Sequence, residues 1–75
     1  MFNNAYGGAN KVTTILRLPT VKGRTGLSRS TIYLRVAEGN FPAPVSLGGR
    51  AVGWIEAEVN DWLAKRIEAS RKAAR

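Results

Sequence analysis

The apolar positions in the last third of the chain recur every three to four residues, which is the spacing of one helix face. The stripe consists of Ile55, Val59, Trp62, Leu63 and Ile67. It predicts an amphipathic helix that packs on a core. The helix is expected to begin near Ile55 or Glu56, since acidic side chains are favourable at the positive end of a helix. The apolar pattern stops after Glu68, so we expect residues 69–75 to form a basic C-terminal tail.

A short helix is predicted from Pro19 to Thr25, after a strand-like stretch of β-branched residues within residues 12–18. Proline is tolerated at the first position of a helix, and Gly26 suits the left-handed residue that ends one. Gly23 inside the segment costs roughly 1 kcal/mol relative to alanine. This helix therefore needs a neighbour to pack on.

The neighbour is a second helix, predicted from Arg29 to about Glu38. Ser28 precedes it and is a favourable N-cap residue. Ile32 and Val36 lie one turn apart, so they share a face that is expected to point into the core. Only a tight turn containing glycine separates the two helices.

Two short extended segments around a glycine pair are predicted to form a β-hairpin. They span residues 45–47 and 51–54, and prolines just before the first of them exclude a helix there. Gly48-Gly49 suits a tight turn, which places Arg50 at or beside its tip. A two-stranded hairpin is marginal alone, so this one must lie against the helices.

The order of these elements predicts a mainly α domain with a small β-hairpin, namely a winged helix-turn-helix over residues 13–68 with three helices and a two-stranded wing. Residues 1–12 contain several asparagines and glycines and are expected to be a flexible N-terminal arm. The predicted core residues are Leu18, Leu27, Ile32, Val36, Trp54, Val59, Trp62 and Leu63.

Basic charge is distributed unevenly along the chain. The formal net charge is +7, no acidic residue precedes Glu38, and residues 38–68 hold all five acids. A one-sided basic distribution is expected of a protein with a polyanionic ligand, although a merely solubilising surface has the same composition. Charge alone therefore supports nucleic-acid binding without deciding it.

The helix-turn-helix predicts which residues contact double-stranded DNA, because its second helix can lie in the major groove. Side chains on the first turns of that helix reach base edges, and arginine can bond guanine through two hydrogen bonds. Tyr33 is equally compatible with a place in the core. The predicted recognition-helix contacts are Arg29, Ser30, Thr31, Tyr33 and Arg35, of which Arg35 suits a phosphate or a surface position better than a base.

Further contacts are predicted on either side of this helix. Lys22 and Arg24 belong to the first helix, which crosses the phosphate backbone in this geometry. Gly49 and Arg50 belong to the wing, where the arginine is placed to enter a minor groove or touch a phosphate. A single domain of this size covers only about 600–1,000 Å² on DNA, so we expect repeated sites, with either neighbouring copies in contact or the DNA bent.

Several runs resemble the AlpA-type prophage regulators, which are similar to MerR-like winged-helix proteins and phage excisionases. They are ILRLP (15–19), TGLSRSTIY (25–33), GNFPAPV (39–45) and LGGRAVGW (47–54), followed by Glu58-Val59 and Trp62-Leu63. The resemblance covers residues 15–67 and implies sequence-specific binding of double-stranded DNA. It also implies a role as a transcription regulator of a mobile element, or as a recombination directionality factor (excisionase) that assists an integrase. Val21-Lys22-Gly23 is lighter and more basic than the family pattern.

Composition argues against other classes of protein. The chain has no cysteine or histidine, so we expect no metal site, no cofactor, no small-molecule ligand and no enzymatic activity. No apolar run is long enough to span a membrane, and a cytoplasmic location is expected. The alternative to DNA readout is a protein-interaction module whose last helix binds an integrase or a polymerase.

Overall fold

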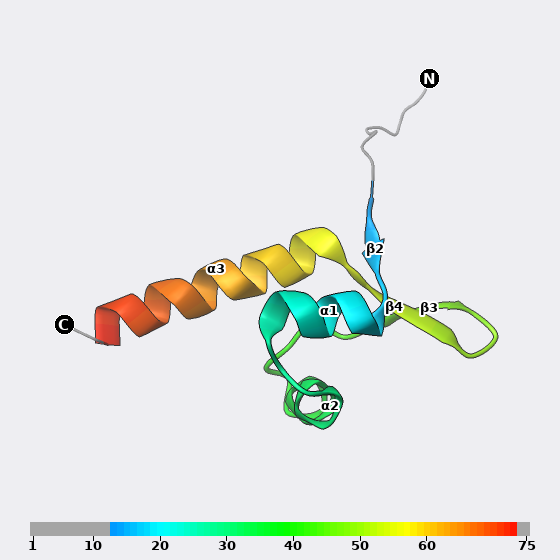
Figure 1. The fold of residues 1–75 in the computed structure, drawn as a ribbon, viewed down its shortest axis with the longest axis horizontal. Coiled ribbons are helices and arrows are strands. Elements are labelled where there is room, and N and C mark those ends of the chain that lie inside the picture. Colours follow the sequence, from blue (N-terminus) through cyan, green and yellow to red (C-terminus); the bar gives the residue numbers. More distant parts are fainter. Residues whose placement is uncertain (1–12, 74–75) are drawn as a thin grey trace, which may run out of the picture.

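The computed structural model describes residues 13–73, so the predicted arm at residues 1–12 lies outside the described residues. Figure 1 shows α1 and α2 packed beside the base of a β-hairpin, while α3 extends away on the opposite side from the hairpin tip. The described residues thus form the predicted winged helix-turn-helix, with three helices and a small antiparallel hairpin. In chain order the elements are β2 (Ile15–Leu16), α1 (Leu18–Thr25), α2 (Arg29–Ala37), β3 (Val45–Gly48), β4 (Ala51–Ile55) and α3 (Glu56–Ala73).

The short strand before the first helix joins the wing to the rest of the domain. The sheet has the order β2-β4-β3 with antiparallel pairs, and Leu16 lies opposite Trp54. The backbone N–H of Glu56 donates to the carbonyl of Thr14 at 2.8 Å, which continues the contact to the start of α3. The predicted wing contained two strands, and pairing with the third strand, β2, gives its base the support that an isolated hairpin lacks.

The hairpin turns tightly at the predicted glycine pair. Gly48 lies opposite Ala51, which leaves Gly49 and Arg50 as the two turn residues. Gly48 and Gly49 have φ angles of 105° and 56°, which residues with a Cβ rarely adopt. The glycine pair therefore permits the turn and sets Arg50 at its tip.

The caps of the first two helices match the predictions. Gly26 is left-handed, with φ 72°, and its N–H donates to the carbonyl of Lys22 at 2.8 Å. The Ser28 side chain accepts a hydrogen bond from the backbone N–H of Thr31 at 3.2 Å, as an N-cap residue does. Glu38 serves as the C-cap residue of α2, so this helix also ends close to its predicted boundary.

The core lies where α1, α2, α3 and the sheet meet. Of the predicted core residues, Ile32, Trp54 and Val59 are fully buried, whereas the other five are half-buried and pack against them: Leu18, Leu27, Val36, Trp62 and Leu63. The buried large apolar residues that were not predicted are Leu16, Val21 and Phe41. These three lie in a two-residue strand, a weakly patterned helix and a loop, where no periodicity identifies a buried face.

The last helix is longer than predicted and only its first half supports the core. It continues to Ala73, past the expected end at Glu68, with an ion pair of 3.6 Å between Glu68 and Lys72 one turn apart. Ile67, the last residue of the apolar stripe, is 50% exposed, because α3 has passed the edge of the domain there. Within residues 13–73, no helix has both the length and the apolar character that crossing a membrane requires.

Candidate nucleic-acid interface

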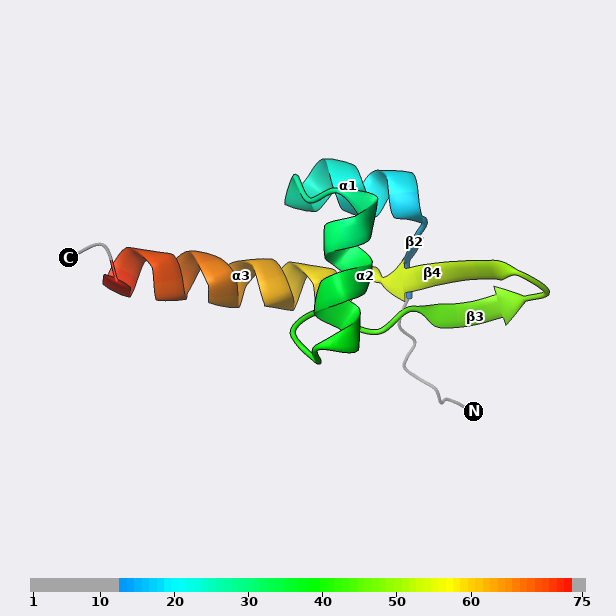
Figure 2. The ribbon, with the colours of Figure 1, turned by 90° about the horizontal axis from the view of Figure 1, so that it is seen from below.

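The outer face of α2 is open along the length of the helix. Figure 1 shows α2 end on at the lower edge of the molecule, and Figure 2, from below, shows it crossing in front of the other elements. Ile32 on its inner side is fully buried, whereas Arg29 and Ser30 on its first turn are exposed. The fold thus anchors one side of the helix and presents the other to an external ligand.

Tyr33 connects the core with this open face. Its ring meets Trp54 edge-on, with centroids 6.0 Å apart and an interplanar angle of 65°. The guanidinium carbon of Arg29 lies 5.3 Å from the centroid of the same ring, a cation–π contact. Arg29, Ser30 and Tyr33 line one shallow hollow. The sequence left a place in the core and a place at the surface as alternatives for Tyr33. The ring packs on the core and also lines the open face of α2.

The hydroxyl groups at the start of α2 are used unequally. Ser28 donates to the hydroxyl of Thr31 at 2.9 Å in addition to accepting from its N–H. Thr31 is half-buried, and its hydroxyl is held by this contact with the N-cap residue. The hydroxyl of Ser30 has a longer contact with Ser28, at 3.5 Å, and the residue is exposed. Ser30 is thus better placed than Thr31 to meet a base.

Arg24 joins the first helix to the last. Its guanidinium forms a 2.7 Å ion pair with Glu56 and donates to the side-chain oxygen of Asn60 at 3.2 Å. Lys22, two residues earlier in the same helix, is exposed. Of the two phosphate contacts predicted on α1, Lys22 is therefore the one that needs no change in an existing contact, and the role of Arg24 stays a prediction.

Arg35 points toward a different side of α2 from Arg29. The residue is half-buried, and its Nε is buried without a hydrogen-bond partner among the described residues. It follows Ile32 by three positions, which places it near the core side of the helix. This position agrees with the expectation that Arg35 does not read a base, and its contact with a phosphate stays a prediction.

The wing carries its basic residue far from α2. Gly49 and Arg50 are both exposed at the turn, and Figure 2 shows the hairpin extending to one side of α2. Arg50 would therefore meet a part of an extended ligand other than the part beneath α2. The role of Gly49 in this arrangement is conformational, since it forms the turn that presents the arginine.

Two tryptophans hold the loop between α2 and the wing, a function that the sequence prediction did not include. The indole N–H of Trp54 donates to the carbonyl of Pro42 at 2.9 Å, and that of Trp62 donates to the carbonyl of Asn40 at 2.7 Å. Phe41, which lies between Asn40 and Pro42 in the sequence, meets the ring of Trp62 edge-on, with ring centroids 4.8 Å apart. These contacts determine where the wing lies relative to α2.

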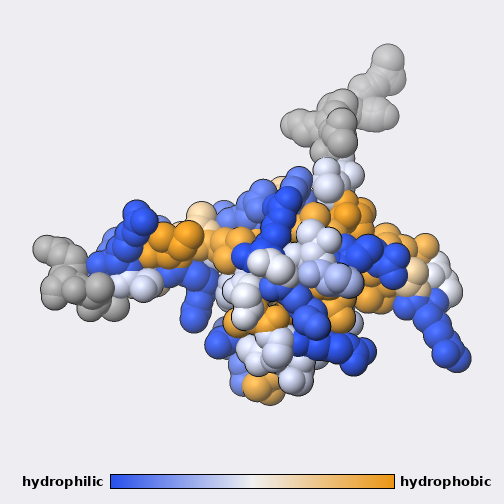
Figure 3. Space-filling view, in the orientation of Figure 1, coloured by the Kyte–Doolittle hydropathy of each residue, from blue (hydrophilic) through white to orange (hydrophobic). Residues whose placement is uncertain are grey.

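Leu34 is an exposed apolar residue on α2 that the sequence analysis did not single out. Its side chain is 58% exposed, and it follows Ser30 by four residues. Figure 3 shows mainly hydrophilic side chains over α1 and α2, with some apolar surface among them. The spacing from Ser30 was the one signal in the sequence that could have placed Leu34 on the same face.

The comparisons with known proteins agree with this architecture. Residues 14–67, well over half of the chain, match the family of the prophage CP4-57 regulatory protein (AlpA). The chain is 54% identical over 57 residues to the uncharacterized protein ORF88 of enterobacteria phage P4, a match that covers 76% of this chain and 64% of the phage protein, less than two thirds of its length. It is 45% identical over 60 residues to the DNA-binding transcriptional activator AlpA of Escherichia coli strain K12, covering 72% of this chain and 86% of that protein. The chain belongs to the family of AlpA prophage regulatory proteins.

Proposed function

We propose that this protein is a DNA-binding regulator of a phage or mobile element. The observation that carries the proposal is the open face of α2, on which Arg29 lies against Tyr33 beside the exposed Ser30. A relative with 45% identity bears the name of a DNA-binding transcriptional activator, and we extend that activity to this chain.

In the proposed complex α2 lies in the major groove of double-stranded DNA. The groove is about 12 Å wide and admits one helix, and the first turns of that helix reach the bases. Arg29 bonds the edge of a guanine, and contact with Tyr33 reduces the number of conformations that its side chain must give up on binding. Ser30 and Thr31 complete the base contacts, while Lys22, Arg24 and Arg35 lie toward phosphates.

The wing makes the second contact in this arrangement. Arg50 stands at the tip of the hairpin turn, which Figure 2 shows extending to one side of α2, so it reaches the neighbouring minor groove or its phosphates. Because the phosphate backbone has the same charge at every sequence, this contact adds affinity more than specificity. Base preference therefore rests with α2.

Binding at repeated sites is part of the proposal. One domain of this kind covers about 600–1,000 Å² on DNA, too little to read a long sequence alone. Adjacent copies of the protein, or an integrase bound beside it, would supply the remaining specificity. We propose that the protein acts through such sites as a transcription regulator, as an excisionase, or as both.

A titration of the full chain against labelled duplexes at several salt concentrations tests the proposal. The logarithm of the association constant should fall by roughly 0.9 per neutralised phosphate for each unit of log salt, which gives a steep slope for several contacts. Arg50→Ala should make the slope shallower by about 0.9, the contribution of one neutralised phosphate. The matched control is Lys65→Ala on α3, a basic residue with a 75% exposed side chain, which should leave the slope unchanged.

Footprinting on the attachment site and the promoters of the host element distinguishes the two regulatory roles. Protection at the attachment site together with stimulated excision supports the excisionase role. Protection at a promoter together with altered transcription supports the regulator role.

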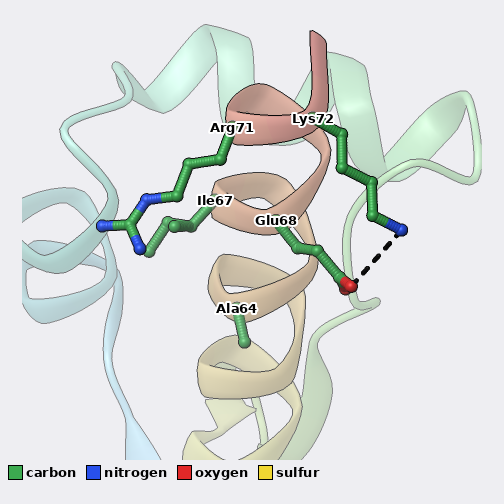
Figure 4. Close-up of a pocket in the computed structure, with 5 residues that line it drawn as sticks. All are labelled: Ala64, Ile67, Glu68, Arg71 and Lys72. Carbon is green, nitrogen blue, oxygen red and sulfur yellow. Dashed lines mark ion pairs between the residues drawn. The ribbon is translucent and has the colours of Figure 1, made fainter. Parts of the chain in front are cut away.

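The second candidate function is protein interaction through α3. Figure 4 shows Ile67 and Arg71 on one side of this helix and the Glu68–Lys72 ion pair on another. Ile67 is half exposed and lies beside Ala64 in a shallow, largely apolar hollow, which favours this candidate. The same titration separates the two functions, because a protein-interaction module without DNA readout shows no shift with any duplex.

A further inference from the structure

Leu34 occupies a position on α2 that folding does not explain. It is 58% exposed, more than Ile67 at 50% or Leu47 at 44%, although it lies near the middle of a helix whose inner side is fully buried at Ile32. With 3.6 residues per turn, Leu34 lies on the side of α2 opposite the core, one turn beyond Ser30. The fold therefore places an apolar side chain on the face that the proposed function assigns to the bases.

We propose that Leu34 contacts the 5-methyl group of a thymine and thereby determines the base preferred at that position. This inference rests on the proposed function, because it requires α2 to lie in the major groove. A leucine side chain has no hydrogen-bonding atom, so it cannot read the donors and acceptors of a base pair. The thymine methyl group is the apolar feature of the major groove, and it distinguishes an A·T pair from the other arrangements.

The geometry of the helix predicts where this thymine lies. Four residues advance an α-helix by about 6 Å, and successive bases along one strand are about 3.4 Å apart. Leu34 should therefore meet a base one or two pairs from the base contacted by Ser30. Arg29 and Ser30 would read hydrogen-bonding edges at one end of the site, while Leu34 reads a methyl group toward the other end.

Removal of one methyl group from DNA tests the inference directly. The full chain first selects its preferred duplex from a random library, and each thymine of that duplex is then replaced singly by deoxyuridine, which lacks only the 5-methyl group. With the unmodified protein, one replacement should weaken binding about fourfold, the fold-change expected from the burial of one methyl group. Leu34→Ala should bind the thymine duplex several-fold more weakly and should lose the penalty at that position.

Leu47→Ala is the matched control, because Leu47 is an exposed leucine that lies on the wing rather than on α2. This variant should keep the deoxyuridine penalty at the position that Leu34 contacts. Thermal unfolding of both variants should match that of the parent, since neither leucine is buried. The coupling between the Leu34 side chain and the methyl group is then obtained from the double-mutant cycle.

The inference is overturned if Leu34→Ala retains the parent's penalty at every thymine, or if no thymine of the selected duplex shows a penalty with the parent protein. It is also overturned if the substitution alters self-association while leaving all the penalties unchanged, because Leu34 would then serve a protein contact. These outcomes leave DNA binding intact. The proposed function fails on a different result: the parent protein selects no duplex at all. The inference on Leu34 then fails with it.

Discussion

The ring of Tyr33 lies between a core residue and a surface residue. Trp54 meets it from the inside, and the guanidinium of Arg29 lies over it from the outside. An exposed cation–π contact of this kind contributes about 0.5–1 kcal/mol, enough to favour one orientation of a long side chain. The position of Arg29 thus depends on the packing of a tryptophan that does not itself reach the surface.

Replacement of Arg29 should change base preference more than it changes stability. If Arg29 bonds guanine through two hydrogen bonds, Arg29→Ala should cost about 1–3 kcal/mol of binding free energy and should make all four bases nearly equivalent at one position. Arg29→Lys should restore the preference only in part, because an ammonium group can donate to guanine but lacks the planar pair of donors. Affinities for the selected duplex and its single-base variants provide the measurement.

The control for this prediction is Arg50→Ala, which should weaken binding by a similar factor for every sequence. If the Arg29→Ala variant discriminates between bases as the parent does, α2 does not lie in the major groove in the proposed orientation.

Gly53 is a second residue whose identity is dictated by its surroundings. A Cβ built at this position would overlap the Cγ2 of Ile15 and would lie 3.2 Å from the carbonyl oxygen of Leu16. Gly53→Ala should therefore destabilise the domain by about 1–3 kcal/mol, since strand β2 must move away from β4. Urea unfolding at equilibrium measures this loss, and a stability equal to that of the parent would mean that the pairing of these strands is looser than the structure shows.

At the scale of elements, α1 is weak by itself and is held by its contacts. It has eight residues and one fully buried side chain, Val21. The ion pair between Arg24 and Glu56 attaches its last turn to α3. Both groups are about one third exposed, so this pair contributes no more than about 1 kcal/mol.

Gly23→Ala should strengthen this helix. Gly23 has helical backbone, and a Cβ at this position would meet no atom within 4 Å in the described structure. The substitution should raise the free energy of unfolding by about 0.5–1 kcal/mol, because alanine loses less backbone entropy on folding than glycine does. The same urea experiment compares it with Gly53→Ala, and the two glycine substitutions are expected to have opposite signs. A destabilised Gly23→Ala protein would contradict the open surroundings of this position.

The difference between the predicted and observed ends of α3 has a local cause. The apolar stripe ends where contact with the domain ends, and a prediction from that stripe places the helix end at the same point. Helix formation continues past Glu68 because alanines and the ion pair between Glu68 and Lys72 favour it without burial.

At the scale of the whole molecule, the two tryptophans couple the loop, the wing and α3. Trp54 is fully buried, whereas Trp62 is half-buried with its ring against Phe41. Each donates its indole N–H to a carbonyl of the loop that follows α2. Because this loop connects the recognition helix to the wing, the two indoles determine the distance between the two proposed DNA contacts.

The tryptophans should differ in their effect on stability. Trp54→Ala should lose about 3–5 kcal/mol, which for a domain of this size abolishes cooperative unfolding. Trp62→Phe keeps most of the apolar contact and leaves the carbonyl of Asn40 without its donor, so it should cost only about 1 kcal/mol. Circular dichroism during thermal unfolding measures both losses, and a loss from Trp62→Phe as large as that from Trp54→Ala would contradict the small cost assigned to the hydrogen bond of the Trp62 indole.

The sequence by itself determined the order of the elements, the caps at Ser28 and Gly26, and the turn at Gly48-Gly49, because each of these depends on residues within a few positions of one another. It also identified three of the buried residues through helical spacing and strand character. Which face of α2 stays open was predictable from the same spacing.

Only the tertiary structure decided how these elements meet. Four features depend on segments far apart in the chain. They are the pairing of β2 with β4, the ion pair of Arg24 with Glu56, the loop carbonyls that accept from Trp54 and Trp62, and the exposure of Ile67. Local propensity carries no information on such contacts, since the entropy of bringing the segments together is offset only by the assembled core.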